Sequence, residues 1–184
     1  MMYRFVLIVT IGLLSFSCSE KQNERNNLIE KSIDYSADGV QLKGYLVYDN
    51  NVKGKRPGVL VVHEWWGLND YTKRRARMLA ELGYTALAVD MYGDGKTADN
   101  PQEAQKLAMS VYQNIKAGED RFLAAYNVLK NQETTDPDLI AAIGYCFGGS
   151  IVLQMARIGT DLKAVVSFHG GLQPIMSAEK GKEK

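Results

Sequence analysis

The sequence has no excess of charge of either sign, no internal repeat, and no apolar run long enough to cross a bilayer. Its 22 lysine and arginine residues are balanced by 21 aspartates and glutamates, whereas a nucleic-acid-binding protein normally carries a basic excess or stripe. The apolar run at residues 5–14 has ten residues, about half of what a spanning helix needs. We therefore expect no nucleic-acid partner, and contact with a membrane only through a lipid anchor.

Cysteine is also scarce, with two in 184 residues. The first, Cys18, follows a start with one positive charge, the apolar run and the small residues Ser15 and Ser17, an arrangement similar to a bacterial lipoprotein signal with Cys18 as the lipidated first residue. We predict a signal peptide at 1–17, a polar tether at 18–29 and a folded domain at 30–184. The protein would then be exported to the bacterial envelope, as a periplasmic protein or an outer-membrane-anchored lipoprotein; secretion with ordinary cleavage and no lipid is the alternative.

The second cysteine, Cys146, then has no partner for a disulfide. Thiols in exported proteins usually pair or oxidise. An unpaired thiol in that compartment indicates either deep burial or chemistry.

The rest of the chain alternates between predicted strands and predicted helices. A hairpin over 32–47, with its turn at Asp38 and Gly39, precedes a continuous apolar run at 58–62, which is typical of a strand buried on both faces of a parallel sheet. The pattern predicts an α/β fold with a mainly parallel sheet and flanking helices. Further strands are expected at 84–89, 139–145 and 162–168, and helices at 70–82 (capped by Asp70), 101–116 (started by Asn100), 119–131 and 147–158.

The segment GYCFGGS at 144–150 places Cys146 between a predicted strand and a predicted helix. The spacing glycine, any residue, nucleophile, any residue, glycine is that of a nucleophile elbow, a strained turn whose neighbours Gly144 and Gly148 must lack a Cβ. The helix start would aim backbone N–H groups at the reacting atoms and favour a thiolate. The alternative is a small buried cysteine at a crowded junction between strand and helix.

A second motif, HEWWGLN at 63–69, directly follows the buried strand at 58–62. Glu64 therefore lies at the carboxyl end of that strand, and Cys146 ends another strand of the same sheet. Ligands of open α/β sheets bind at the carboxyl ends of the strands. We expect Glu64 and Cys146 to share one edge, since a carboxylate beside two tryptophans is unfavourable without a partner or a task.

These two motifs, together with AVDMY at 88–92 and SFHGG at 167–171, resemble the dienelactone hydrolase family in order and spacing over about residues 30–175. The resemblance implies an α/β-hydrolase fold and hydrolysis of lactones or other carboxylic esters. It also implies a Cys-His-Asp triad that works without a metal or an organic cofactor.

The resemblance assigns roles to individual positions. Cys146 matches the nucleophile, and Glu64 matches a glutamate that helps to produce the thiolate when substrate arrives. The backbone N–H groups of Trp65 and Phe147 match the oxyanion hole, although the two tryptophans could also be simple packing residues. Further pocket residues are expected to be Trp66, Tyr92 and His169.

The family's triad acid and histidine have no matching positions in this sequence, because no aspartate follows Asp161 and no apolar run follows Phe168. We therefore expect an α/β-hydrolase fold that lacks its last strands, as a fragment, with two alternatives: a short natural member that works differently and a non-catalytic remnant. His169 is interpreted as a loop or pocket residue, with a role as substitute base left open. His63 should point to the opposite face of its strand from Glu64 and have a structural role.

The function expected from the sequence is hydrolysis of a small-molecule ester or lactone through Cys146, impaired because the triad acid and histidine are absent. Dienelactone itself is not assigned as the substrate, since the loop at 92–96 carries Lys96 as its only basic residue. The rival hypothesis is a non-catalytic exported module that binds a small molecule or a partner. A thiol redox function is disfavoured, because Cys146 has no nearby resolving cysteine.

Overall fold

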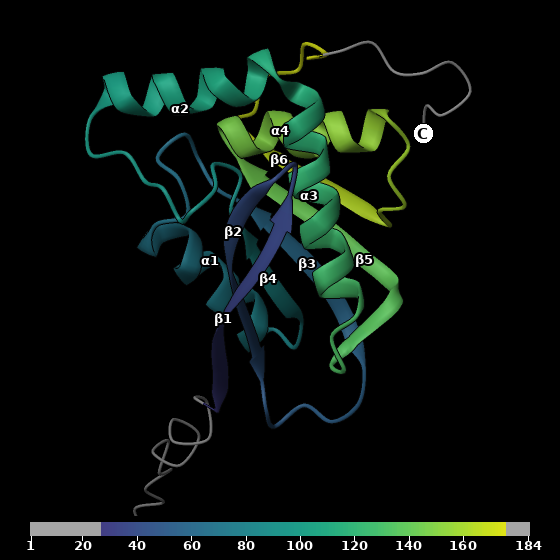
Figure 1. Ribbon diagram of the computed structural model, residues 1–184. Coiled ribbons are helices and arrows are strands. Elements are labelled where there is room, and N and C mark those ends of the chain that lie inside the picture. The colour runs from purple at the N-terminus through teal and green to yellow at the C-terminus, as the bar shows by residue number, and fades with distance from the viewer. Residues whose placement is uncertain (1–26, 176–184) are drawn as a thin grey trace, which may run out of the picture.

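A computed structural model describes residues 27–175, which form one mixed sheet flanked by helices (Figure 1). The predicted signal peptide at 1–17, Cys18, most of the predicted tether and the charged tail lie outside the described residues. Along the sheet the strands follow the order β1-β2-β4-β3-β5-β6. The strands are β1 (Leu28–Ala37), β2 (Val40–Asp49), β3 (Arg56–Val62), β4 (Thr85–Val89), β5 (Thr135–Tyr145) and β6 (Ala164–Phe168).

The four central and outer strands β4, β3, β5 and β6 run parallel to one another, as expected for strands joined by helices. The hairpin β1–β2 lies antiparallel at the other side of the sheet. Its turn residues Asp38 and Gly39 both have positive φ, 52° and 71°, as a two-residue type I′ turn requires. The prediction of a mainly parallel sheet is therefore confirmed, with an antiparallel hairpin added at one side.

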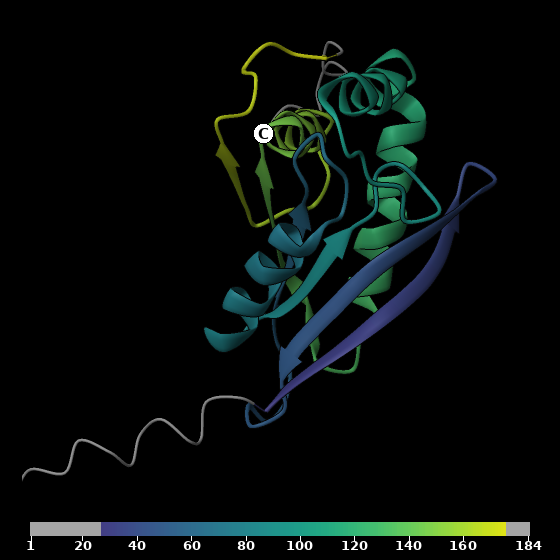
Figure 2. The ribbon, with the colours of Figure 1, turned by 90° about the vertical axis from the view of Figure 1, so that its left-hand side faces the viewer.

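Helices cover both faces of the sheet, so that β3 is buried on both sides. Leu60 and Val62 pack in a cluster with side chains of α3 and α4, and Val61 packs in a second cluster with side chains of α1. Figure 2 shows α1 on one side of the sheet and α3 on the other. The helices are α1 (Asp70–Glu81), α2 (Pro101–Gln113), α3 (Ile115–Lys130) and α4 (Phe147–Arg157).

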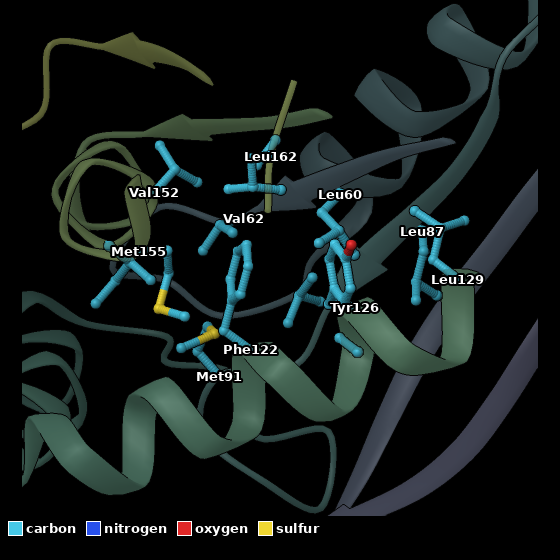
Figure 3. Packing of buried hydrophobic residues seen from close by; sticks show 14 of the residues in the cluster. Leu60, Val62, Leu87, Met91, Phe122, Tyr126, Leu129, Val152, Met155 and Leu162 are labelled. Atoms are coloured by element: carbon cyan, nitrogen blue, oxygen red, sulfur yellow. The ribbon is translucent and has the colours of Figure 1, made fainter. Parts of the chain in front are cut away.

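The larger cluster is centred on one face of α3. Phe122 and Leu129 are fully buried and point toward the strands, whose residues Leu60, Val62 and Leu87 belong to the same cluster (Figure 3). Val152 and several other residues of α4 complete the cluster. This packing ties α4, and with it the turn that precedes α4, to the centre of the sheet.

Several predicted boundaries were wrong by a few residues. The cap of α1 is Asn69 rather than Asp70, because the Asn69 side chain accepts hydrogen bonds from the N–H groups of Tyr71 and Thr72 at 3.1 and 3.3 Å. The break after α2 falls at Asn114 rather than near residue 117, since Asn114 has non-helical φ of −128° and its side chain caps α3. Strand β1 begins at Leu28, so the sheet starts two residues before the predicted domain boundary at 30.

The strand predictions were less accurate at the sheet's outer side. β5 begins at Thr135, four residues before the expected 139, because Arg56 and Pro57 of β3 pair with Thr135 and Asp136 across a register shift. β6 begins at Ala164 rather than at residue 162. Within residues 27–175, β6 is the last strand of the sheet and is paired on one side only.

Candidate active site

Cys146 lies on the sharp turn that joins β5 to α4. Its backbone has φ of 53° and ψ of −115°, a conformation that costs a non-glycine residue about 1–3 kcal/mol and persists only where the surroundings enforce it. The Cys146 N–H donates to the carbonyl of Phe168 at 2.9 Å, and its carbonyl accepts from the Ser150 N–H at 3.2 Å. The partly buried thiol is free, and the turn has the geometry of a nucleophile elbow.

The glycines of this turn are required by close backbone contacts. A Cβ placed on Gly144 would lie 2.1 Å from the carbonyl oxygen of Gly148, and a Cβ on Gly148 would lie 2.4 Å from the carbonyl oxygen of Val62. Both distances are far inside van der Waals contact, and both involve backbone atoms that cannot move aside. The sequence-based expectation that both positions must lack a side chain is confirmed.

Glu64 lies at the same edge of the sheet as Cys146. Val62 of β3 pairs with Gly144 of β5, so Glu64 and Cys146 each come two residues after a matched pair on neighbouring parallel strands. The Glu64 side chain is 28% exposed, and its Oε1 lies 3.8 Å from Nε2 of His169, a contact that becomes an ion pair when His169 is protonated. The shared edge expected from the sequence is present.

His63 is fully buried beneath this edge. Its Nδ1 lies 2.5 Å from the carbonyl oxygen of Glu64, and its Nε2 accepts from the Met91 N–H at 3.3 Å. Burial lowers the pKa of His63 to about 4, although the Glu64 carbonyl and the charge of Asp90 act in the opposite direction. His63 is therefore neutral at ordinary pH, with its proton on Nδ1, and has the structural contacts expected of it.

Trp65 and Phe147 are the two residues expected to provide oxyanion donors. The Trp65 carbonyl accepts from the Tyr92 hydroxyl at 2.9 Å, and burial raises the pKa of Tyr92. Phe147 is the first residue of α4, so its N–H has no acceptor within the helix. The Phe147 ring packs on the rings of His63 and Tyr92 at centroid distances of 5.7 and 5.5 Å.

Trp66 and His169 lie at the rim of the site. The Trp66 ring meets Trp65 edge-on at 5.1 Å, and its carbonyl accepts from the Ala98 N–H at 3.0 Å, so Trp66 packs as a wall. His169 has positive φ of 46° and a side chain that is 64% exposed. Of the site residues expected from the sequence, the structure brings all those within the described range to one end of the sheet.

Tyr112 is a neighbour of the thiol that sequence reasoning missed. Burial raises the pKa of Tyr112, and a hydrogen bond with the Ser150 side chain acts in the opposite direction. Its ring lies 5.3 Å from that of Phe147. Tyr112 comes from the end of α2, where no motif marks it, so only the folded arrangement of α2 over the turn reveals it.

Asp90 was part of a recognised motif but had no role assigned to it. It is fully buried, and its two carboxylate oxygens accept from the N–H groups of Lys43, Tyr92, Gly93 and Gly95 at 2.8–3.0 Å. The carboxylate thereby holds the loop that follows β4 and that carries Tyr92. The conformation of the loop after β4 thus depends on the hydrogen bonds that backbone N–H groups donate to the buried Asp90 carboxylate.

Neither a metal centre nor a membrane span is found among residues 27–175. No three histidine, cysteine, aspartate or glutamate side chains of this range gather closely enough to hold a metal ion. None of the helices in the same range is both long and apolar enough to cross a bilayer.

A cysteine at positive φ between a parallel strand and a helix N-terminus, in a mixed sheet flanked by helices, is the arrangement found in the α/β-hydrolase fold. The family model of the dienelactone hydrolase family matches residues 42–184. The chain belongs to this family.

Relatives and solved structures agree with this assignment. The chain is similar to the protein usf of Aquifex pyrophilus (35% identity, covering 75% of this chain and 60% of the relative) and to a putative carboxymethylenebutenolidase of Aquifex aeolicus (34% identity, the same coverage). The structure of a dienelactone hydrolase-like promiscuous phosphotriesterase from metagenomic libraries is 40% identical, with a TM-score of 0.78 over 82% of this chain and 63% of that one. The chain thus spans about 60% of the length of the curated relatives it matches.

Proposed function

We propose that this protein attacks small carboxylic esters or lactones with the thiolate of Cys146. The observation that carries the proposal is the φ of 53° at Cys146, on a turn that is in register with Glu64 across β3 and β5. An unfavourable backbone conformation at a free thiol, enforced by close glycine contacts, has a ready explanation in nucleophilic catalysis. The name of the relative from Aquifex aeolicus, putative carboxymethylenebutenolidase, points to the same chemistry.

In the proposed reaction Glu64 accepts the thiol proton and the Cys146 sulfur bonds to the substrate carbonyl carbon. The negative oxygen that develops is held by the N–H groups of Trp65 and Phe147, each of which contributes on the order of 3 kcal/mol by precedent. Collapse of the intermediate breaks the bond to the leaving alcohol, which takes up the proton. A thioester between the acyl group and Cys146 remains, and water must then release the acid.

The second half of the reaction is proposed to be slow. The chain has two histidines, and both ring nitrogens of His63 are engaged by backbone groups. The other, His169, is largely exposed and faces the Glu64 carboxylate. Within residues 27–175 no buried acid orients a histidine toward Cys146, so these residues alone give hydrolysis of the thioester no general base and the acyl-enzyme should accumulate.

A burst experiment with p-nitrophenyl acetate tests the proposal. The chain should release p-nitrophenolate in a fast stoichiometric burst followed by a slow steady state, and mass spectrometry should find the acetyl group on Cys146. Cys146→Ala should abolish the burst and Glu64→Gln should slow it. The matched control is Cys18→Ala, which removes the chain's other cysteine and should leave the burst intact.

A chain that shows no burst, and whose Cys146 reacts with iodoacetamide no faster than a buried thiol, would contradict the proposal. The non-catalytic exported module that binds a small molecule or a partner would then be the better description. A fast steady state without a burst would contradict only the slow second step.

We also propose that the protein is exported and lipidated at Cys18, on the strength of the sequence at residues 1–18. Expression of the full chain with radiolabelled palmitate in a Gram-negative bacterium should label it and place it in the membrane fraction. Cys18→Ala should abolish both labelling and membrane association. A native chain that is cleaved yet unlabelled would support ordinary secretion instead.

A further inference from the structure

His63 has contacts that bear directly on one of the proposed oxyanion donors. The carbonyl of Glu64 and the N–H of Trp65 belong to the same peptide group, and a peptide group is planar with its C=O and N–H pointing in opposite directions. Whatever fixes the direction of the Glu64 carbonyl therefore fixes the direction of the Trp65 N–H. Two groups donate to this carbonyl: Nδ1 of His63 at 2.5 Å, and the N–H of Gly67 at a longer 3.3 Å. The shorter contact is the one to His63, and it is the one made by a side chain.

The His63 ring is itself held in place. Its Nε2 accepts from the N–H of Met91 at 3.3 Å, so that the ring bridges the ends of β3 and β4. The ring of Tyr92 meets it edge-on at 4.7 Å, and the ring of Phe147 stacks on it at 5.7 Å with 18° between the planes. Both hydrogen bonds can form at once only when the neutral ring carries its proton on Nδ1. Burial favours the neutral ring, and the two backbone partners select this tautomer.

Tyr92 acts on the other side of Trp65. Its hydroxyl donates at 2.9 Å to the Trp65 carbonyl, which belongs to the peptide group that follows the Trp65 N–H. The N–H of Tyr92 in turn donates to Asp90 at 3.0 Å. The two peptide groups on either side of the Trp65 Cα are thus each held by a side chain from a different part of the site.

We propose that His63, with Tyr92 on the far side, is a positioning residue that aims the Trp65 N–H at the oxygen of the acylation transition state. The inference rests on the proposed function, and it assigns His63 no proton transfer and no contact with substrate. Donors that are already oriented stabilise a developing charge without reorganisation, whereas a displacement of about 1 Å can cost about 100-fold in rate. If His63 had only a structural role, a substitution that replaces the function of Nδ1 and one that replaces the function of Nε2 should have equal effects on the acylation rate.

Two substitutions of similar polarity separate the two ring nitrogens. His63→Asn keeps an N–H near the place of Nδ1, within reach of the Glu64 carbonyl, while His63→Gln keeps an acceptor near the place of Nε2 for Met91. We expect the acylation burst of the Gln variant to be about 10- to 100-fold slower than that of the native chain, and that of the Asn variant to be within about threefold of it. The rates are measured as the pre-steady-state release of p-nitrophenolate.

Alkylation of Cys146 by iodoacetamide provides the matched readout. Displacement of iodide develops no oxyanion, so both variants should be alkylated within about twofold of the native rate. This readout separates a misaimed donor from a damaged nucleophile, and thermal melting followed by circular dichroism checks that each variant is folded. Equal burst rates for the Asn and Gln variants, with alkylation preserved, would overturn the inference.

Tyr92→Phe keeps the proposal testable if neither His63 variant folds. It removes one hydroxyl and retains the ring that packs on His63 and Phe147. We expect its burst to slow by about three- to tenfold while its alkylation rate stays native; an unchanged burst would contradict the inference. A native chain that forms no acyl-enzyme would defeat the proposed function itself, and the two failures are therefore distinguishable.

Discussion

The carboxyl ends of β3 and β5 differ sharply from strand β6, which lies beside β5 in the same sheet. At the carboxyl ends of β3 and β5, His63 is fully buried and Gly148 is in contact with the backbone of β3. On β6, Val166 and Phe168 are each 44% exposed, although both are large and apolar. The proposed chemistry lies where backbone and side chains are held from several directions, which is what a strained turn needs in order to persist.

The exposed face of β6 continues onto α1. The ring of Phe168 stacks on the ring of Tyr145 of β5 with centroids 4.8 Å apart, and the guanidinium of Arg75 lies over the Tyr145 ring, 5.5 Å from its centroid. Between α1 and β6 there is an apolar groove of about 230 Å³. An edge strand with exposed apolar side chains favours association between molecules. Substitutions at the turn before α4 should therefore change mainly the free energy of unfolding, whereas substitutions on β6 should change mainly self-association. The groove is lined by Arg75, Met78, Leu79, Leu82, Ile143, Tyr145, Val166 and Phe168.

The largest effect is expected from a methyl group added beneath the turn. Gly148→Ala would place a Cβ 2.4 Å from the Val62 carbonyl oxygen, and relief requires α4 to move away from β3. We expect a loss of about 3 kcal/mol or more in the free energy of unfolding, measured by urea denaturation. The control is Gly171→Ala, beyond β6, where the nearest atom is a side-chain oxygen at 3.3 Å; equal losses in the two variants would contradict the comparison.

Lowering the pH should reduce the free energy of unfolding, because His63 is buried in its neutral form. The folded pKa of about 4 lies below the ordinary value of 6.5, so the unfolded chain binds a proton that the folded chain does not between these two values. Titration of His63 therefore takes nothing from the free energy of unfolding above about pH 6.5. As the pH falls from there toward 4, it lowers that free energy by about 1.4 kcal/mol per pH unit. The charged group facing the ring is Asp90, which opposes the shift but does not cancel it.

Urea denaturation at several pH values measures this slope. His63→Asn should remove it, because asparagine does not titrate. His169→Asn should retain it, since the His169 side chain is largely exposed. An unchanged slope in the His63 variant would assign the acid sensitivity to other groups.

A moderate effect is expected at the start of α1, which directly follows the loop of Trp65 and Trp66. Asn69→Ala removes the acceptor for two N–H groups and should lower the free energy of unfolding by about 1 kcal/mol. Asp70→Ala should lower it by less, because Asp70 lies within the first turn and acts through the helix dipole and an exposed ion pair with Lys73 at 3.9 Å. The opposite order would restore Asp70 as the cap.

The smallest effect on stability is expected on β6. Val166→Lys places a charge on an exposed apolar edge strand and should change the free energy of unfolding by no more than about 0.5 kcal/mol. Self-association, measured by light scattering as a function of concentration, should decrease, while alkylation of Cys146 stays at the native rate. A marked loss of stability would show that β6 is more tightly packed than its exposure indicates.

Strand and helix types could be predicted because each depends on a local pattern. The apolar run in β3 and the Asp38-Gly39 turn each specify one conformation through neighbouring residues alone. Boundaries were harder to predict: β5 extends to Thr135 only because β3 is there to pair with it. The cap of α1 depends on which of two adjacent polar side chains reaches the free N–H groups, a matter of backbone geometry.

For the site, the sequence by itself determined that Cys146 is framed by glycines and that Glu64 ends a buried strand, because both follow from the order of residues along the chain. Only the tertiary structure decided how these residues are held. The ring of His63 joins a carbonyl of one strand end to an N–H of another, and Tyr112 reaches the turn from a separate helix. Such contacts depend on distances between segments that lie far apart in the chain, and no local pattern encodes them.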